Sequence, residues 1–417
     1  MRGAPWLLLA SLTLAGCPPD PSPPDRPTTP VGPVLGPVTS TSATVWMWPG
    51  AAARAVLRAR PAGALAGAPV GATDQRELTL VPDPAARGSA VGVLRDLPPG
   101  SAWEYEVEVD GVVAPTARGR LRLAPGDGPA RVRLALASCM DAVSQPVQPS
   151  WYLLRAERPD LLLLLGDNVY CDSTDPAVAF AAHLRQRSVR EFAAVAREVP
   201  VLATWDDHDY AGDDTDRTAP GKADALRTFR AVFPDPGAGL PEAPGTFFRA
   251  RWGPVELFVL DVRSWRDPNQ APDGPDKTIL GAAQEAWLLE GLSASRAPFK
   301  LVCSGSTFAA VPHDGWARFT HARARLFQEI ARRRVEGVLL CSGDLHRCQV
   351  DEHPAPEGGY PLIEVISSGI AQGPEQGFAL LELDDTLEDP TVTIRLVQGD
   401  ATVALTRVVR RSELQAR

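Results

Sequence analysis

The apolar residues of this chain follow two different patterns in succession. Between residues 34 and 123 they form short runs that alternate with polar residues, and glycine or proline separates one run from the next. The alternation is clearest in residues 103–109, WEYEVEV, which are followed by Asp-Gly, a dipeptide typical of hairpin turns. This pattern predicts a small all-β sandwich domain over residues 34–123.

A second pattern occupies the rest of the chain. Residues 124–130, APGDGPA, are rich in glycine and proline and are expected to form a linker. From residue 131 to 417, apolar runs typical of buried strands, such as LLLLL at 161–165, alternate with helix-like segments such as 177–199 and 322–334. Strands that alternate with helices favour an α/β fold. We therefore expect a large α/β domain over residues 131–417, with further β-strands near its end.

The first residues have the pattern of an export signal. Arg2 is followed by a short apolar run and by small residues, and the run is too short to span a bilayer, so residues 1–16 are expected to be a signal peptide. Residues 14–17, LAGC, resemble the bacterial lipobox, in which the cysteine is lipidated and becomes the mature N-terminus. Simple secretion with an unrelated Cys17 is the alternative. The Pro-rich residues 17–33 are expected to form an extended tether.

These features predict a location and exclude some partners. We expect an exported protein, lipid-anchored through Cys17 in the bacterial cell envelope, at the outer membrane or in the periplasm. The formal charge is −9 with no long basic run, so no nucleic-acid-binding surface is expected. No protein partner is evident from the sequence. The chain has six cysteines, and those beyond Cys17 are odd in number without a disulfide framework, although Cys341 and Cys348 could pair.

Polar clusters follow several of the predicted strands. They are SCMD at 138–141, GDNVYCD at 166–172, DDHD at 206–209 and GDLH at 343–346. Ligands of open α/β sheets bind at the carboxyl ends of strands, so these clusters are expected to converge. Without a cation, Asp167, Asp207 and Asp344 would repel one another by about 4 kcal/mol per pair at ~4 Å and an effective dielectric near 20. The clusters are therefore interpreted as metal ligands, and the number of donors suggests two or more ions.

Five motifs, in this order and spacing, resemble those of the PhoD-type alkaline phosphatases/phosphodiesterases, a branch of the metallophosphatase superfamily. They are GDNVY, WDDHDY, FVLDVRSWRDP, LGAAQEAWL and SGDLH. The resemblance runs from about Val34 to the C-terminus and includes the opening strands of the β domain. It implies a metallophosphatase-type α/β sandwich, with helices flanking mixed β-sheets, preceded by the small all-β domain.

The same resemblance implies a metal centre of one ferric ion and one or two calcium ions. Six residues match the family's metal ligands: Cys139, Asp167, Tyr170, Asp207, Asp344 and His346. Cys139, Tyr170 and His346 match ligands of the iron, and Asp167 matches the carboxylate that bridges the ions. The other two aspartates match ligands of calcium. The donor chemistry agrees, since hard oxygen ligands suit Ca²⁺, whereas thiolate and phenolate suit an oxidised transition metal.

Residues beyond the metal ligands are expected to act on the substrate. His208 falls where metallophosphatases keep a histidine that contacts the phosphoryl group. Asp172 falls where the family places a carboxylate near an additional calcium or the phosphate. Arg263 and its neighbour Arg266 could clamp phosphate bidentately, or they could hold Asp261 and the surrounding loop in place.

The expected function is that of an exported, metal-dependent phosphatase or phosphodiesterase of the alkaline phosphatase D type. Its substrate would be a phosphate mono- or diester, hydrolysed by metal-activated hydroxide, because a bound metal lowers the pKa of water from 15.7 to about 7. No serine or lysine is arranged as a covalent nucleophile, so a single direct displacement is expected. The alternative is a tethered cell-surface binding module with a vestigial metallophosphatase site.

Several residues near the motifs also have simpler interpretations. Cys139 could be a small buried hydrophobic residue, and Asp141 could cap the segment that follows it. Asp213 stands where relatives often have asparagine. His183 is expected at the surface or rim, and His313 could approach the cleft from a loop.

Overall fold

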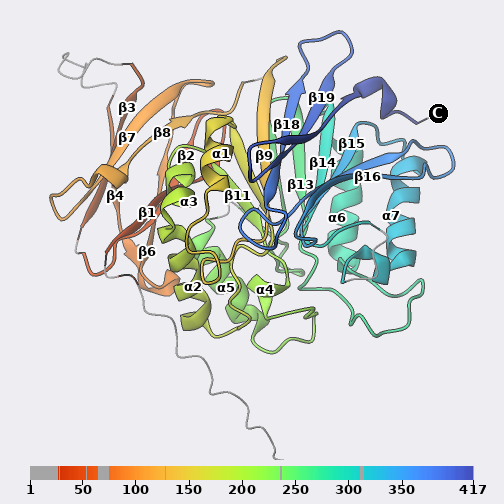
Figure 1. The fold of residues 1–417 in the computed structure, drawn as a ribbon, viewed down its shortest axis with the longest axis horizontal. Coiled ribbons are helices and arrows are strands. Elements are labelled where there is room, and N and C mark those ends of the chain that lie inside the picture. The colour runs from red at the N-terminus through yellow and green to blue at the C-terminus, as the bar shows by residue number, and fades with distance from the viewer. Residues whose placement is uncertain are drawn as a thin grey trace, which may run out of the picture.

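The computed structural model describes most of the chain (Figure 1). The described residues are 27, 29–52, 54–63, 75–126, 128–234, 237–309 and 314–416. The expected signal peptide, residues 1–16, and the expected lipidation site Cys17 lie outside them. Within these ranges, no helix combines the length and the apolar composition that crossing a membrane requires.

The N-terminal region is a sandwich of two four-stranded sheets in which all neighbouring strands are antiparallel. One sheet contains, in order, β1 (Val31–Val38), β2 (Ala43–Trp48), β6 (Ser89–Leu94) and β5 (Pro82–Asp83). The other contains β4 (Arg76–Leu80), β3 (Ala55–Pro61), β7 (Ala102–Val109) and β8 (Arg118–Arg122). β1 thus begins at Val31, within the last residues of the expected tether, residues 17–33.

Strand β7 shows why the alternating pattern forms this sandwich. Trp103, Tyr105 and Val107 are buried in the core. The glutamates between them point the other way and pair with arginines of β3 and β8. Successive side chains of a strand face opposite sides of its sheet, so one face is apolar and the other is charged.

The larger region contains two six-stranded mixed sheets. One has the order β11 (Val201–Thr204), β10 (Leu161–Leu165), β9 (Arg131–Ala137), β18 (Gly377–Asp384), β19 (Thr391–Gln398) and β20 (Val403–Arg410). The other has the order β12 (Phe248–Trp252), β13 (Val255–Val259), β14 (Phe299–Ser304), β15 (Val338–Ser342), β17 (Leu362–Ser367) and β16 (Cys348–His353). Strands β9 to β11 are parallel to one another, and so are β13, β14, β15 and β17.

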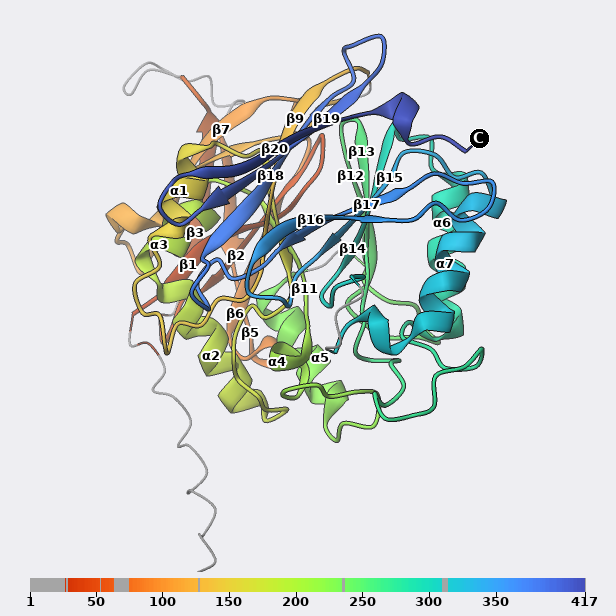
Figure 2. The same ribbon diagram turned by 45° about the vertical axis from the view of Figure 1, so that its right-hand side comes forward.

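Helices cover the outer faces of both sheets (Figures 1 and 2). Beside the first sheet lie α1 (Ser150–Ala156), α2 (Pro176–Ser188), α3 (Arg190–Ala196), α4 (Asp207–Tyr210) and α5 (Lys222–Val232). Beside the second lie α6 (Gly281–Ala294) and α7 (Thr320–Arg332). Short 3₁₀ helices occupy η1 (Pro84–Ala86), η2 (Pro115–Ala117), η3 (Trp316–Arg318) and η4 (Arg411–Glu413). The expected single helix over 177–199 is divided at Val189, whose ψ of 120° is not helical.

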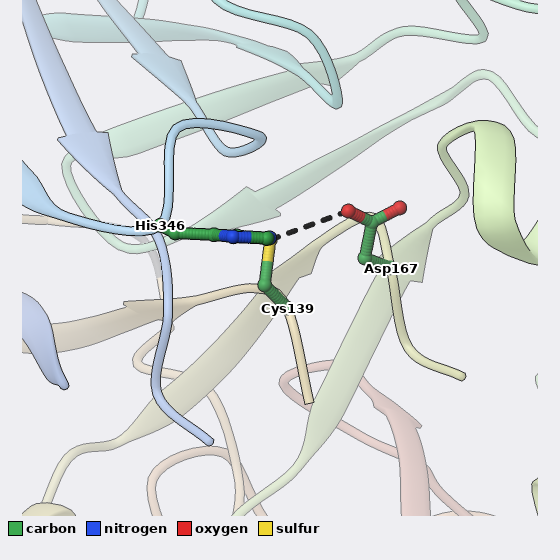
Figure 3. Close-up of side chains that lie close together, drawn as sticks. All are labelled: Cys139, Asp167 and His346. Atoms are coloured by element: carbon green, nitrogen blue, oxygen red, sulfur yellow. Dashed lines mark hydrogen bonds between the residues drawn. The ribbon is translucent and has the colours of Figure 1, made fainter. Parts of the chain in front are cut away.

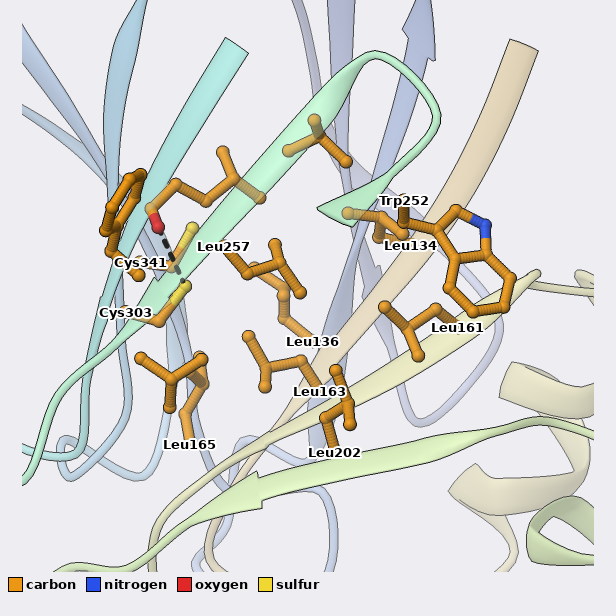
Figure 4. Packing of buried hydrophobic residues seen from close by; sticks show 14 of the residues in the cluster. Leu134, Leu136, Leu161, Leu163, Leu165, Leu202, Trp252, Leu257, Cys303 and Cys341 are labelled. Atoms are coloured by element: carbon orange, nitrogen blue, oxygen red, sulfur yellow. Dashed lines mark hydrogen bonds between the residues drawn. The ribbon is translucent and has the colours of Figure 1, made fainter. Parts of the chain in front are cut away.

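The leucine run of β10 is buried on both faces. Leu161, Leu163 and Leu165 pack between the two sheets (Figure 4), whereas Leu162 and Leu164 pack against the helices. A strand of a parallel sheet that is covered on both sides has no polar face, which explains the unbroken apolar run. The predicted α/β domain and the preceding all-β sandwich are both confirmed.

The N-terminal sandwich packs directly on the helices of the first sheet. Trp46 of β2 donates its indole N–H to the carbonyl of Ala231, at 2.8 Å. The buried guanidinium of Arg187 lies 5.0 Å from the Trp46 ring and 4.2 Å from the Phe233 ring. His183 is buried beside it, so the expectation of a surface or rim position is wrong. Burial lowers the pKa of His183, which favours the neutral ring that an apolar interface accepts.

Candidate metal centre

The predicted polar clusters do lie where parallel strands end. Cys139 follows β9, Asp167 follows β10, and Asp207 follows β11. Asp344 and His346 follow β15 in the second sheet. The two sheets therefore present these residues from neighbouring strand ends, as the α/β pattern predicts.

The backbone at these strand ends is unusual. Cys139, Asp167, Asp172, Asp344 and His346 all have positive φ, between 46° and 76°. A side chain makes this left-handed conformation unfavourable, and it persists only where the surroundings fix it. Its concentration at one place indicates that the loops are shaped to aim these side chains.

Cys139, Asp167 and His346 form the first group of donor atoms (Figure 3). One donor atom from each lies within 4.8 Å of the others. The Cys139 Sγ is 3.3 Å from Asp167 Oδ2, and Tyr170 Oη is 2.9 Å from His346 Nε2. The Asp167 Oδ1 atom is buried and has no hydrogen-bond partner in the described part of the chain. These positions bring four of the predicted ligands together.

The electrostatic environment of this first group is strongly anionic. Burial raises the pKa of Asp167 well above its ordinary value, and the nearby Cys139, Asp207, Asp206 and Asp209 raise it further. Burial is also the largest cause of the raised pKa of Tyr170, followed by Cys139 and Asp167. A buried carboxylate beside other acidic groups is costly unless a cation is supplied.

The second group of donor atoms is centred on Asp207. Asp207 lies within 4.8 Å of both Asp167 and His208, and it also forms a separate group with Asp214 and Asp314. Asp207 accepts backbone hydrogen bonds from His208 at 3.1 Å and from Asp214 at 2.9 Å. Asp207 thus links the sulfur-containing group to a purely carboxylate group.

Asp344 lies beside this second group. It is half-buried, and removal from water raises its pKa, as do the charges of Asp206 and Asp207. It does not belong to any of the three close groups of donor atoms in the described residues. Its role as a calcium ligand stays a prediction.

Arg263 is fully buried among carboxylates. Its Nε donates to Asp206 Oδ1 at 2.5 Å, and its Nη2 contacts Asp314 and lies 3.7 Å from Asp207. Burial lowers the pKa of Arg263, but these carboxylates outweigh that effect and raise the pKa well above its ordinary value. Of the two predicted roles, holding the loop in place fits this geometry better than clamping phosphate. The carboxylates that its side chain contacts are Asp206 and Asp314 rather than Asp261. Asp261 accepts from the backbone N–H groups of Arg263 and Ser264 instead.

Arg266 belongs to the same network. Its side chain is fully buried, and its Nη2 donates to Asn269 at 2.6 Å and to Asp314. Burial and the neighbouring Arg263 lower the pKa of Arg266 to about 10, although Asp314 acts in the opposite direction. The two arginines therefore share Asp314.

His208 and Asp172 form a close pair at the open side of the centre. His208 Nδ1 is 2.6 Å from Asp172 Oδ1, and the side chains are 19% and 52% exposed. The imidazole also lies on the Tyr170 ring, with ring centres 4.1 Å apart. Burial lowers the pKa of His208, but the hydrogen bond to Asp172 and the charge of Asp207 outweigh it and raise the pKa to about 9. The pair fixes the direction of the ring and leaves Nε2 as the nitrogen not bonded to Asp172.

Residues 134–398 match the model of the PhoD-like phosphatase family. The chain belongs to that family. The resemblance predicted from the five motifs is confirmed.

Known relatives agree with this assignment. The PhoD-like chain is 24% identical over 306 residues to alkaline phosphatase D of Bacillus subtilis (strain 168), covering 60% of this chain and 52% of that protein. The match therefore spans about half the length of the curated relative. In fold, the chain is similar to the solved structure of PhoD, with a TM-score of 0.77 at 18% identity over 94% of this chain and 93% of that one.

A second solved structure extends the fold similarity. It is a purple acid phosphatase from yellow lupin (Lupinus luteus) seeds, with a TM-score of 0.65 at 13% identity, over 92% of this chain and 75% of that one. At these identities the two structures show the fold, and the predicted metallophosphatase-type architecture is confirmed.

The donors of this PhoD-like centre fit the metals that the resemblance implies. A thiol, a phenol, an imidazole and a carboxylate with one bare oxygen meet on one side, in Cys139, Tyr170, His346 and Asp167. The other side offers carboxylate oxygens from Asp207 and its neighbours. Sulfur and phenolate suit an oxidised transition metal, and oxygen donors suit calcium.

Some residues of the centre carry no signal in the sequence motifs. Asp314 has no motif of its own and becomes visible only through its contacts with Arg263 and Arg266. Ser368 accepts the backbone N–H of His346 at 2.8 Å, and its Oγ is 3.1 Å from Cys139 Sγ. Asp314 and Ser368 each contact residues that are far away along the chain, so a motif search could not have identified these two residues.

Other predictions have mixed outcomes. Asp141 caps its own loop by accepting the Val143 N–H at 2.8 Å, as one interpretation expected. Asp209, the last acidic residue of the DDHD cluster, is buried and accepts from the Asn168 backbone N–H at 3.0 Å. Each cysteine in the described ranges is a free thiol, so the suggested pairing of Cys341 and Cys348 does not form. His313 lies outside the described residues.

Proposed function

We propose that this protein is a metal-dependent phosphoric ester hydrolase of the alkaline phosphatase D type. The observation that carries the proposal is the first donor group, in which the bare Asp167 oxygen lies beside Cys139 and His346 without a cation from the described residues. Burying such acidic groups together is unfavourable, and a bound metal ion removes the penalty. The family membership supports phosphate esters as the substrates.

The proposed iron ligands are Cys139, Asp167, Tyr170 and His346, and the proposed calcium ligands are Asp207 and Asp344, with Asp167 shared. When bound, such ions act as Lewis acids and lower the pKa of a bound water toward neutrality. Asp214 and Asp314 lie close enough to Asp207 to contribute oxygen atoms to the calcium side.

His208 is proposed to contact the phosphoryl group. In the metal-free protein burial lowers its pKa, but the hydrogen bond to Asp172 and the charge of Asp207 outweigh this and raise the pKa to about 9, which favours a protonated ring with a donor N–H. Asp172 holds the Nδ1 side of the ring at 2.6 Å, which leaves the Nε2 side to donate to a phosphoryl oxygen. Charge would then be stabilised on the oxygens where it develops during hydrolysis.

The experiment that tests this function combines metal analysis with an assay. Purified protein is analysed by elemental mass spectrometry and absorption spectroscopy, and is assayed on p-nitrophenyl phosphate and bis(p-nitrophenyl) phosphate with Ca²⁺. We expect turnover that a chelator abolishes, and a visible charge-transfer band from thiolate or phenolate bound to Fe³⁺. Bound metal without turnover of either substrate would instead favour a binding module with a vestigial site.

Two variants separate the iron assignment from metal dependence in general. Cys139→Ser is expected to weaken or shift the visible band and to lower activity, because it replaces the thiolate ligand. Cys171→Ser is the matched control, since this half-buried thiol contacts backbone carbonyls rather than the donor group. Full activity and an unchanged band in Cys139→Ser would exclude Cys139 as an iron ligand. Full activity in a protein that shows no visible band would remove the iron assignment but keep a metal enzyme.

We also propose that the protein is exported and lipid-anchored through Cys17. The support is the sequence of residues 1–17, with its apolar run and its lipobox-like LAGC. Metabolic labelling with a radioactive fatty acid is expected to label the wild-type protein and not Cys17→Ala. Equal labelling of both proteins would contradict the anchor.

A further inference from the structure

A buried carboxylate outside the donor groups has an unusual set of contacts. Glu364 lies on β17, the strand next to β15, and none of its side chain is exposed. A carboxylate in such a position is costly unless hydrogen bonds and opposite charges stabilise it. Its partners show which segments its burial holds together.

One carboxylate oxygen of Glu364 accepts three hydrogen bonds. Oε1 accepts from Thr307 Oγ1 at 3.0 Å, from the Phe308 N–H at 2.8 Å, and from the Ser342 hydroxyl. Thr307 and Phe308 lie on the segment after β14, whereas Ser342 is the last residue of β15. Glu364 therefore joins two separate segments of the second sheet.

The Ser342 segment leads directly to a predicted metal ligand. Gly343 and then Asp344 follow it, and the Gly343 N–H donates to the Gly305 carbonyl at 2.9 Å. A Cβ on Gly343 would lie 2.5 Å from the Leu165 carbonyl and 2.6 Å from Ser138 Oγ, so the turn is packed tightly on the ends of β10 and β9. A shift of Ser342 would therefore move the turn that aims Asp344.

The Thr307 segment leads to the other side of the centre. Ser306, the residue before it, donates its hydroxyl to Asp206 Oδ1 at 3.2 Å and accepts from Arg263 Nη2 at 3.1 Å. Asp206 directly precedes Asp207, the residue shared by two groups of donor atoms. Glu364 therefore bonds to Thr307, and the neighbouring Ser306 bonds to Asp206 of the carboxylate network.

The charge of Glu364 is stabilised away from the metal centre. Its Oε2 faces His353 Nε2 at 2.9 Å, and His353 is nearly buried beside the Phe327 ring. Arg323 of α7 donates to the Phe308 carbonyl at 2.8 Å, and its charge interacts favourably with Glu364. Glu364 therefore differs from Asp167, whose strongest neighbours are all acidic.

We propose that Glu364 is a positioning residue of the metal centre. It holds the turn with Asp344 and the Thr307 segment in fixed relative positions, so that both sides of the centre can bind metal. The proposal rests on the proposed function. Residues that orient metal ligands commonly change metal affinity by 10–100-fold when they are replaced. Glu364 contacts no donor of the described centre directly, so its effect would pass through Ser342 and Ser306.

The test compares variants that keep or remove the acceptor. Glu364→Met has a similar length and no acceptor, whereas Glu364→Gln keeps an oxygen for the Ser342, Thr307 and Phe308 donors. Metal retained after dialysis is measured by elemental mass spectrometry, Ca²⁺ affinity by calorimetry, and folding of the metal-free form by thermal unfolding. We expect about a tenfold loss of metal affinity in Glu364→Met and recovery to within about twofold of wild type in Glu364→Gln.

Tyr360→Phe is the matched control for a purely structural loss. The buried Tyr360 hydroxyl accepts from the Val338 N–H at 3.1 Å and donates to the Val335 carbonyl at 2.9 Å, at the opposite end of β15. This variant is expected to lower the thermal stability of the metal-free protein and to leave metal affinity unchanged. If Glu364→Met does not fold, Ser342→Ala and Thr307→Val each remove one donor, and each is expected to weaken metal binding by about twofold to tenfold.

The outcomes separate this inference from the function it rests on. Wild-type protein that holds no metal would overturn both. The positioning role alone would be overturned if the wild-type protein holds metal and Glu364→Met binds metal with the same affinity. If Glu364→Met does not fold, wild-type affinity in Ser342→Ala and Thr307→Val would have the same meaning. Metal loss in Tyr360→Phe equal to that in Glu364→Met would also overturn it, because any loss of stability would then have the same effect.

Discussion

The two sides of the metal centre contain acidic groups of equal burial but in opposite electrostatic settings. On the side of Asp167, burial raises the pKa, and the strongest neighbouring charges raise it further because they are all acidic. On the side of Asp314, burial also raises the pKa, but Arg263 and Arg266 outweigh it and hold the pKa below its ordinary value. Among the described residues, the arginines act on the Asp314 side, whereas the largest charge effects on Asp167 all come from acidic groups.

Asp207 stands between the two settings. Burial raises its pKa, but Arg263 and then His208 outweigh this and lower the pKa to about 2. It is therefore ionised at all pH values of interest and is within 4.8 Å of Asp167. The Arg263 side is thus a scaffold that arginines partly neutralise, whereas the acidic groups around Asp167 are the place where the proposed metal ion would supply the positive charge.

Removal of Arg263 should have the largest effect, because it takes away the cation that separates the two sides. Arg263→Met leaves Asp206 and Asp314 buried without their cation, and breaking a buried pair in this way costs about 3–5 kcal/mol. We expect a loss of this size in the free energy of unfolding of the metal-free protein, measured in urea, with part of it recovered on adding Ca²⁺.

The control for this change is Arg325→Met. Arg325 pairs with Glu285 at 2.7 Å on the helix surface and is 36% exposed, so its loss should cost at most about 1 kcal/mol. Equal losses in the two variants would contradict the view that Arg263 is the internal cation of the centre.

Replacement of Asp167 should have opposite effects on activity and stability. Asp167→Asn removes the proposed bridging carboxylate. Replacing a residue that only orients a metal ligand lowers activity by about 10–100-fold, so the loss of a ligand should lower the hydrolysis of p-nitrophenyl phosphate by about 100-fold or more. The metal-free variant should nevertheless be more stable than wild type at pH 7. The folded-state pKa of Asp167 is raised, so the folded protein holds the proton more tightly, and stability is lost as the pH rises above 3.8.

The free energy of unfolding, measured for both metal-free proteins across pH, tests whether Asp167 lowers stability as the pH rises. The two metal-free proteins should converge below about pH 3.8, where Asp167 is protonated in both states, and should diverge as the pH rises. Asp160→Asn is the control, because burial also raises the pKa of Asp160 but that residue bonds to the Arg133 backbone, away from the donor atoms. It should keep full activity. A wild-type protein that is the more stable of the pair at pH 7 without metal would refute the interpretation of Asp167.

The smallest expected effect concerns the open edge of the centre. Asp172→Asn removes the charge that favours protonated His208, so the pKa of His208 should fall from about 9. Activity at neutral pH should drop by about tenfold, and the alkaline limb of the pH–rate profile should move to lower pH, because the proposed donor loses its proton earlier.

Asp175→Asn is the matched control for the loss of one nearby negative charge. Asp175 caps α2 by accepting from Ala177 and Val178, and asparagine is an equally good cap. An identical shift of the pH–rate profile in both variants would show a general charge effect rather than the Asp172–His208 pair.

Much of this organisation is predictable from local patterns. The alternation in β7 and the unbroken leucines of β10 report which faces of a strand are covered, because side-chain direction repeats every two residues. The polar residues after β9, β10, β11 and β15 are likewise visible, since the ends of parallel strands meet at one edge. The burial of His183 was not predicted, because it depends on the packing of the N-terminal sandwich on the helices, where Trp46 and Arg187 meet. The division of the helix at Val189 was not predicted either, because the apolar pattern continues across it.

By itself, then, the sequence determined the strand and helix pattern, the family, and the set of acidic and soft side chains that converge. Only the tertiary structure decided which of these groups receives an internal cation, that Asp172 pairs with His208, and that Glu364 joins the segments behind Asp344 and Ser306. The physical reason is that periodicity reflects contacts with the solvent or the core, which each residue makes locally. Ion pairs between distant residues such as Arg263 and Asp314 depend on how whole elements pack, and no spacing along the chain encodes that distance.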